Sequence, residues 1–193
     1  MTLPTKLTIL RIFIAILIMA LLFAPGWMAK SAALGCFLFA SLTDWLDGYL
    51  ARRWKQTSSF GALLDPIADK ALVLGTLLAF VQLRLVPAWM VLIIVVRESL
   101  ITGVRLFAAS RNIVLSAARE GKQKTVSQMA TIVVILSVLL IRELPGHPLS
   151  SEADTALAQL ILACLWITTV LTVVSGTSFF WRHRTVLRDA VNH

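Results

Sequence analysis

Six apolar runs of about 20 residues alternate with short polar segments along the chain. A run of this length can cross the hydrocarbon core of a bilayer as a helix. Turns are predicted at Pro25-Gly26 and Pro145-Gly146, and Pro87 suits the first turn of a helix. The pattern therefore predicts six membrane-spanning helices, at residues 7–23, 31–49, 60–82, 87–107, 125–141 and 156–180.

Composition leads to the same fold class. Hydrophobic residues make up 58% of the 193 positions and charged residues only 15%, whereas a soluble domain carries about 25% charged residues. We expect an all-α, polytopic membrane protein with a single domain over residues 1–193. The first apolar run leads through a turn straight into the second, so we expect it to be retained rather than cleaved as a signal peptide. Cys36 and Cys164 lie within apolar runs and are expected to be buried free thiols.

The basic residues are distributed unevenly between the two sides of such a membrane domain. With a cytoplasmic N-terminus, thirteen of the 18 would lie on the cytoplasmic side: Lys6, Arg11, Arg52, Arg53, Lys55, Arg105, Arg111, Arg119, Lys122, Lys124, Arg182, Arg184 and Arg188. Only Lys30, Arg84 and Arg142 would lie opposite. This asymmetry predicts that both termini face the cytoplasm, in the cell's inner membrane. The net charge of +8 then reflects topology, and anionic lipid headgroups and phosphate-bearing substrates are the expected partners rather than nucleic acid.

Four of the ten acidic residues lie within 26 positions, at the cytoplasmic ends of the second and third predicted helices. Asp44 and Asp47 are three residues apart, and Asp65 and Asp69 are four apart, so each pair shares a helical face. The connection between the helices is short, so we expect them to be antiparallel neighbours. The sequence thus predicts that four carboxylates converge at one depth, where ionisable groups are costly and usually functional.

Four clustered carboxylates repel one another unless something balances their charge. Two unit charges 4 Å apart interact by about 4 kcal/mol at an effective dielectric near 20. Protonation or basic partners would relieve this repulsion, but divalent metal does so best. All-oxygen ligands favour Mg²⁺ or Mn²⁺, and Ca²⁺ is a further option. Two such ions could share the four side chains.

Small residues and an arginine accompany the aspartates. Gly48 and Ala51 follow the first pair, and Gly61 precedes Asp65 by one turn. Small side chains would let a bulky ligand approach the backbone, although close helix packing in a membrane explains them as well. Arg52 can meet a phosphate bidentately or can simply serve as a cytoplasmic topology signal.

Together, these residues read D-W-L-D-G-Y-L-A-R, then eight residues, then G-A-L-L-D-P-I-A-D. This resembles the signature of the CDP-alcohol phosphatidyltransferase family, D-x-x-D-G-x-x-A-R, eight residues, G-x-x-x-D-x-x-x-D. All eight fixed positions match with the correct spacing. The predicted six-helix layout extends the resemblance over nearly the whole chain, and homodimerisation is an expectation from the family.

The resemblance implies a site and a reaction. In the family, two divalent metals bind the aspartates, and the alcohol attacks the β-phosphorus of a CDP-linked lipid so that CMP leaves. It implies that Asp69 is the general base as well as a metal ligand. Lys70, its neighbour, would favour the ionised form of this base. The residues implied to bind the CDP-lipid are Asp47, Gly48, Ala51, Arg52 and Gly61.

A second set of basic residues is a candidate site for the phosphate of the acceptor alcohol. They lie near the cytoplasmic ends of the fourth and fifth predicted helices: Arg105, Arg119, Lys122 and Lys124. The segment G-K-Q-K-T opens the fifth helix, where two lysines and free backbone amides suit a phosphate. The alternative for these residues is topology alone, and Arg97 beside Glu98 suits a structural ion pair.

The G-K-Q-K-T segment, the Arg-Glu pair followed by Arg105, and the start P-T-K-L-T-I-L-R resemble the phosphatidylglycerophosphate synthase branch of the family. That branch joins CDP-diacylglycerol to glycerol 3-phosphate. Cardiolipin synthases, which use phosphatidylglycerol, are the main alternative, ahead of inositol phosphate and serine acceptors. A cation- or proton-coupled transporter is an alternative of another class, but its usual repeated halves are not found.

Overall fold

The computed structural model describes the backbone of residues 3–54, 59–111, 119–146 and 150–192. It describes the side chains of residues 9–43, 70–111, 123–146 and 150–184. Within these ranges the chain is helical and contains no strand. The helices are α1 (Leu3–Phe23), α2 (Trp27–Trp54), α3 (Ser59–Gln82), α4 (Ala88–Ser110), α5 (Arg119–Glu143) and α6 (Ser151–Asn192). The all-α prediction is therefore confirmed.

Both predicted proline-glycine turns are present. Gly26 ends the α1–α2 turn at φ +98°, and Gly146 follows α5 at φ +82°. This left-handed conformation is strained for a residue with a Cβ, so glycine suits both positions. Pro87 lies immediately before α4, where its backbone is extended at φ −64° and ψ 128°. It caps the helix rather than opening its first turn.

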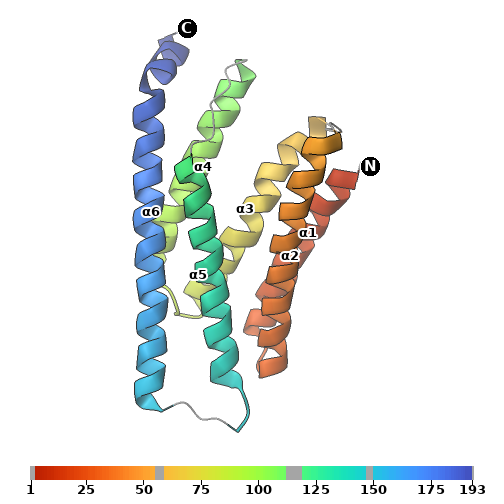
Figure 1. The fold of residues 1–193 in the computed structure, drawn as a ribbon, viewed down its shortest axis with the longest axis vertical. Coiled ribbons are helices and arrows are strands. Elements are labelled where there is room, and N and C mark those ends of the chain that lie inside the picture. The colour runs from red at the N-terminus through yellow and green to blue at the C-terminus, as the bar shows by residue number, and fades with distance from the viewer. Residues whose placement is uncertain (1–2, 55–58, 112–118, 147–149, 193) are drawn as a thin grey trace.

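Successive helices run in opposite directions, so both termini lie at one end of the bundle (Figure 1). The last turn of α2 and the first turn of α3 lie at this same end, which we call the terminal end, and the α1–α2 turn lies at the other, the distal end. Helix α1 packs against both α2 and α3, and α6 packs against α4 and α5. Helices α2 and α3 are antiparallel as predicted, but in Figure 1 they approach at their connected ends and diverge toward the distal end.

Apolar side chains lie both inside and outside this bundle. Ile18, Phe37 and Phe80 are completely buried and join the core that links α1, α2 and α3. Large apolar side chains also face outward: Phe13 is 66% exposed and Leu92 61% exposed. A soluble monomer rarely exposes apolar surface so extensively, whereas a lipid environment accommodates it.

Two helices meet the length and hydropathy needed for a membrane span within the described side chains, at residues 123–143 and 151–184. Helices α1, α2 and α3 contribute shorter apolar stretches there, at residues 9–23, 27–43 and 70–82. Helix α4 is interrupted by three charges, at Arg97, Glu98 and Arg105. The prediction of six helices is confirmed, while the number that crosses a membrane belongs to the proposal below.

A buried lysine ties the α1–α2 turn to α5 at the distal end. Lys30 is 5% exposed, and its Nζ donates to the carbonyl oxygens of Leu22 at 2.7 Å and Ala24 at 2.6 Å. It also lies 3.5 Å from Glu143 Oε1, and the other oxygen of Glu143 accepts from the Gly26 amide. The ammonium group thus satisfies the Leu22 carbonyl in the last turn of α1, where carbonyls lack partners within the helix, and the Ala24 carbonyl just after it.

Candidate active site

The backbone places the four predicted metal ligands at matching heights. Asp44 and Asp47 precede the end of α2 by ten and seven residues, and Asp65 and Asp69 follow the start of α3 by six and ten. At 1.5 Å per residue, both pairs lie about 9–15 Å from the α2–α3 connection. Four residues link the two helix ends, so these ends are at most roughly 18 Å apart. The positions of the two pairs along α2 and α3 permit the predicted arrangement, and the convergence of the four side chains stays a prediction.

The side chains of the predicted CDP-lipid and metal sites lie outside the described residues. This holds for Asp44, Asp47, Gly48, Ala51, Arg52, Gly61, Asp65 and Asp69. Among the side chains that are described, no group of three or more His, Cys, Asp or Glu gathers. Their roles as ligands therefore remain predictions.

An ionic cluster lies beside this region and centres on Glu98 of α4. Its Oε2 accepts a hydrogen bond from Lys70 Nζ of α3 at 2.6 Å. Its Oε1 accepts from Arg97 Nη1 at 2.9 Å and from Lys124 Nζ of α5. Glu98 and Lys124 side chains are each 8% exposed, so these bonds are shielded from solvent. One carboxylate thus joins three helices, and the predicted Arg97–Glu98 ion pair is confirmed as part of this larger group.

Arg97 also reaches the last helix. Its Nη2 donates to Ser175 Oγ of α6 at 2.8 Å, and the arginine stem crosses the face of α6 at Gly176. A Cβ built on Gly176 would lie 3.1 Å from Arg97 Cγ. Glycine at this position therefore gives the arginine room to lie between α4 and α6.

A line of hydroxyl groups continues from the cluster along the α5–α6 interface. Thr168 of α6 lies within hydrogen-bond distance of Ser127 Oγ and, at 2.8 Å, of Thr131 Oγ1. Thr172 Oγ1 donates to the Thr168 carbonyl at 2.7 Å. Such bonds between membrane helices are worth about 0.6 kcal/mol each on average. The bonds of Thr168 to Ser127 and Thr131 link α6 to α5 on the distal side of the ionic cluster, whereas the Thr172 bond lies within α6.

Among the described side chains, three cations of the cluster face one carboxylate. Ionisable groups at membrane depth are costly and usually mark a functional site. The terminal end of the bundle therefore combines two features of opposite sign. Four acids lie on α2 and α3, and a cationic group lies where α3, α4 and α5 meet. This pairing suits a reaction in which metal and phosphate groups are held together.

The predicted acceptor residues fall in different places. Lys124 lies in the ionic cluster, but Arg105 is exposed and stacks on the Phe179 ring of α6, 5.4 Å from its centroid. Arg105 follows Arg97 by eight residues, which is about 12 Å along α4. The side chains of Arg119 and Lys122 lie outside the described residues. The described contacts thus place Lys124 against Glu98 and Arg105 against Phe179, and their joint role at an acceptor site stays a prediction.

Helix α5 begins earlier than the sequence suggested. It starts at Arg119 rather than at the G-K-Q-K-T segment. The free amides at the start of a helix belong to its first turn, which here precedes Lys124. The predicted contribution of backbone amides therefore shifts to the turn beginning at Arg119, and Lys124 instead projects inward from the second turn.

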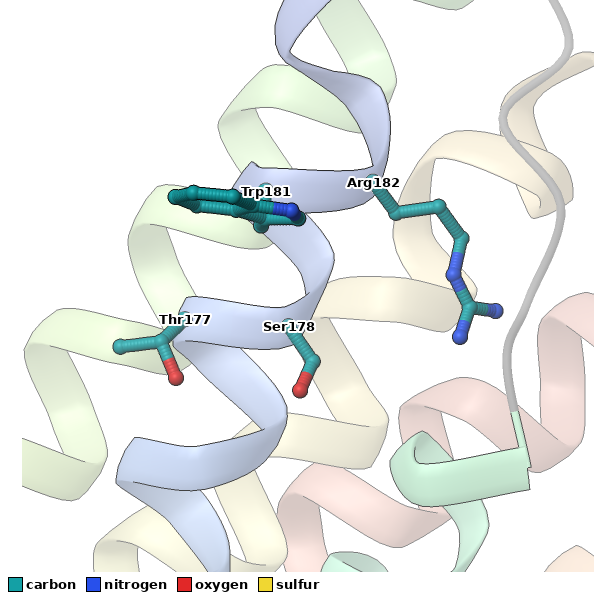
Figure 2. A pocket seen from close by; sticks show the side chains of 4 residues that line it. All are labelled: Thr177, Ser178, Trp181 and Arg182. Carbon is teal, nitrogen blue, oxygen red and sulfur yellow. The ribbon is translucent and has the colours of Figure 1, made fainter.

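A shallow hollow of about 450 Å³ opens on α6 near the terminal end. Thr177, Ser178, Trp181 and Arg182 line it, and Figure 2 shows the Arg182 side chain extending toward the first turns of α5. Trp181 is 73% exposed, and the Arg184 guanidinium stacks 4.6 Å from the centroid of its indole ring. Tryptophan and arginine in this arrangement are typical of a membrane–water interface.

Comparison with known proteins supplies the family. The sequence pattern of the CDP-alcohol phosphatidyltransferases matches residues 1–174. The chain belongs to the CDP-alcohol phosphatidyltransferase family. A Bacillus subtilis protein named CDP-diacylglycerol–glycerol-3-phosphate 3-phosphatidyltransferase is 38% identical, covering 97% of this chain and 98% of its own length. A Cereibacter sphaeroides protein of the same name is 33% identical with the same coverage.

A rice relative carries a different name within the same family. It is called cardiolipin synthase (CMP-forming) and is 35% identical over 91% of this chain, which corresponds to 55% of its own length. The resemblance predicted from the aspartate motif is therefore confirmed at the level of the CDP-alcohol phosphatidyltransferase family. The choice of acceptor within that family rests on the proposal below.

Sequence reasoning missed the partners of Lys70 in this family member. The Lys70 ammonium group bonds Glu98 of α4. Its predicted effect on Asp69 stays a prediction, because the Asp69 side chain lies outside the described residues. The available signal was Glu98 itself, a lone acid in an apolar helix that required cationic partners.

Replacing Gly176 by alanine tests the packing of Arg97 against α6. Because the new Cβ would crowd Arg97 Cγ, we expect a loss of about 1 kcal/mol in stability. Gly103→Ala on α4 is the matched control, since nothing lies within 4 Å of its Cβ position, and alanine there should be neutral or stabilising. Thermal unfolding in detergent measures both. A Gly176→Ala protein that melts at or above Gly103→Ala would contradict the described packing.

Proposed function

We propose that this chain transfers the phosphatidyl group of CDP-diacylglycerol to glycerol 3-phosphate, forming phosphatidylglycerophosphate and releasing CMP. The observation that carries the proposal is near-full-length similarity to bacterial proteins named for this reaction. The complete aspartate motif from Asp44 to Asp69 supports the chemistry. The cationic cluster around Glu98 supports an acceptor that bears a phosphate.

The four aspartates fit two divalent ions, Mg²⁺ or Mn²⁺. Carboxylate oxygens are the ligands that these hard cations prefer. The sequence positions of one i, i+3 pair on α2 and one i, i+4 pair on α3, each six to ten residues from the linked helix ends, support such a site. Bound metal would neutralise the pyrophosphate and stabilise the departing CMP oxygen. Asp44, Asp47, Asp65 and Asp69 are the residues that would hold it.

The residues of the chain then supply position and a proton acceptor. Gly48, Ala51 and Gly61 leave room for the CDP moiety, and Arg52 pairs with its phosphate oxygens. The oxygen of the free primary hydroxyl of glycerol 3-phosphate bonds to the β-phosphorus, and Asp69 accepts the proton of that hydroxyl. The bond from that phosphorus to the CMP oxygen breaks, and CMP leaves. An in-line displacement of this kind depends mainly on positioning and charge.

The proposed enzyme spans the inner membrane six times with its site facing the cytoplasm. Thirteen basic residues on one side against three on the other support this orientation. The bundle carries both termini and the aspartate-bearing ends of α2 and α3 at the same end (Figure 1). Soluble glycerol 3-phosphate would reach the site from the cytoplasm.

Cardiolipin synthesis is a second candidate function, because the rice relative is named cardiolipin synthase. The two candidates share the CDP-lipid and differ in the acceptor, since phosphatidylglycerol is a lipid and glycerol 3-phosphate is a small dianion. The buried cationic cluster favours the smaller and more highly charged acceptor.

A panel of acceptors tests the proposal. Purified protein in detergent with CDP-diacylglycerol and Mg²⁺ should release CMP when glycerol 3-phosphate is added and should form phosphatidylglycerophosphate, identified by mass spectrometry. Glycerol, inositol phosphate, serine and phosphatidylglycerol are the comparison acceptors, and we expect background release with each. Release with phosphatidylglycerol alone would assign the chain to cardiolipin synthesis, and release with none would refute both.

A further inference from the structure

We infer that Glu98 is a positioning residue that holds Lys124 and Lys70 in place for the phosphate of the acceptor. The inference rests on the proposed function and deepens it, because it assigns a role to a residue outside the aspartate motif. Glu98 would not touch the reacting atoms. It would act through the two lysines that it binds.

The geometry around Glu98 supports this role. Each of its oxygens accepts from a lysine on a different helix, Oε2 from Lys70 on α3 and Oε1 from Lys124 on α5. The exposed fractions of the two lysine side chains are 24% and 8%. Long, flexible ammonium side chains lose much rotational freedom when they are fixed in this way. The carboxylate therefore holds both lysines in place before any substrate binds.

Arg97 differs from the lysines in its anchoring. It donates to Ser175 on α6 as well as to Glu98, so it keeps one partner if the carboxylate is lost. Within the described part of the chain, Glu98 is the acceptor that Lys70 and Lys124 reach. Loss of the carboxylate would therefore release the lysines more than the arginine.

The cluster is also placed to serve an anion. Lys70 directly follows Asp69 on α3, and Lys124 lies in the second turn of α5. Among the described side chains, three cations surround the single carboxylate of Glu98, and this local positive charge suits a phosphate. We expect the phosphate of the acceptor to bind this positive charge, between Asp69 and the start of α5. The hydroxyl group of the acceptor would then contact Asp69.

Positioning and simple charge predict opposite effects of removing Glu98. If the carboxylate contributed only its negative charge, its loss would strengthen binding of a phosphate by leaving more positive charge nearby. If it holds the lysines, its loss lets three neighbouring cations repel one another and move apart, which weakens binding. The sign of the change in the KM for glycerol 3-phosphate therefore distinguishes the two roles.

The first test is Glu98→Gln, measured by CMP release over a range of both substrates. We expect the KM for glycerol 3-phosphate to rise about tenfold or more, and the KM for CDP-diacylglycerol to change less than about twofold. Glu143→Gln is the matched control, because Glu143 pairs with Lys30 at the distal end and should leave both KM values unchanged. An unchanged or lower KM for glycerol 3-phosphate in Glu98→Gln would overturn the inference.

A double-mutant cycle tests whether Glu98 acts through Lys124. We expect Lys124→Gln alone to raise the KM for glycerol 3-phosphate, and addition of Glu98→Gln to raise it little further. Fully additive effects would show that Glu98 acts elsewhere. Glu98→Asp keeps the charge with a shorter reach, so it should give an intermediate KM and remains testable if the glutamine variant does not fold.

Wild-type protein separates this inference from the proposed function. If wild type releases no CMP with glycerol 3-phosphate, the proposed function fails. If wild type is active and the Glu98 variants differ from it only in melting temperature, with unchanged KM values, Glu98 is a structural residue and the inference alone fails.

Discussion

Replacing Asp69 by asparagine is expected to lower kcat for CMP release by about 10²–10⁴-fold, the usual contribution of a general base. The amide keeps the shape of the side chain but cannot accept the proton of the acceptor hydroxyl. Metal-dependent binding of CDP-diacylglycerol should persist, because three aspartates remain. Steady-state CMP release measures kcat. Binding of labelled CDP-diacylglycerol with and without Mg²⁺ measures the metal-dependent affinity for that lipid.

Asp154→Asn is the matched control for that experiment. Asp154 forms an exposed ion pair with Arg142 at the distal end, with 2.7 Å between Arg142 Nε and Asp154 Oδ1. The same chemical change there should leave kcat within about twofold, since exposed ion pairs contribute little. An Asp69→Asn enzyme that retains wild-type kcat would exclude Asp69 as the base, and loss of folding would indicate a structural role instead.

Complete removal of divalent metal is expected to abolish turnover. Without a cation, four carboxylates at matching heights on α2 and α3 repel one another and cannot hold a pyrophosphate. Dialysis against chelator should reduce CMP release to background, and Mg²⁺ or Mn²⁺ should restore it.

Unfolding gives a readout of metal binding that does not depend on activity. A ligand that binds only the folded protein stabilises it by about 2.7 kcal/mol at a concentration 100 times its Kd, so added Mg²⁺ should raise the melting temperature in detergent. The same addition to a variant with Asp44 and Asp65 both changed to asparagine should raise it much less. Full activity in rigorously chelated protein would refute the proposed role of all four aspartates.

The helical fold could be predicted from the sequence because apolar run length determines which segments can cross a bilayer. The helix ends could not. Helix α6 continues to Asn192, although its predicted apolar run ends at residue 180. Hydropathy falls where charged residues begin, but several of the residues that follow are good helix formers: Arg182, Arg184, Leu187 and Arg188. Hydropathy indicates where the membrane ends, whereas backbone hydrogen bonds determine where the helix ends.

The candidate site, too, could be predicted from the sequence only in part. The spacing of Asp44, Asp47, Asp65 and Asp69 could be read from the chain because helical periodicity relates neighbours three or four positions apart. The link from Glu98 to Lys70 and Lys124 joins residues 28 and 26 positions apart. Only the packing of three helices brings these residues together. Cys36 and Cys164 were predicted to be buried free thiols. Both are free but only half-buried.

The bonds of Lys30 have a consequence for traffic through the bilayer. Lys30 and Glu143 fasten the α1–α2 turn to the end of α5, on the face opposite the proposed chemistry. In the proposed orientation this end faces the outer leaflet, and these bonds would have to break before the bundle could open there. CDP-diacylglycerol would enter the site laterally from the inner leaflet, and the new phospholipid would be released into the same leaflet. Delivery to the other monolayer would then fall to separate machinery.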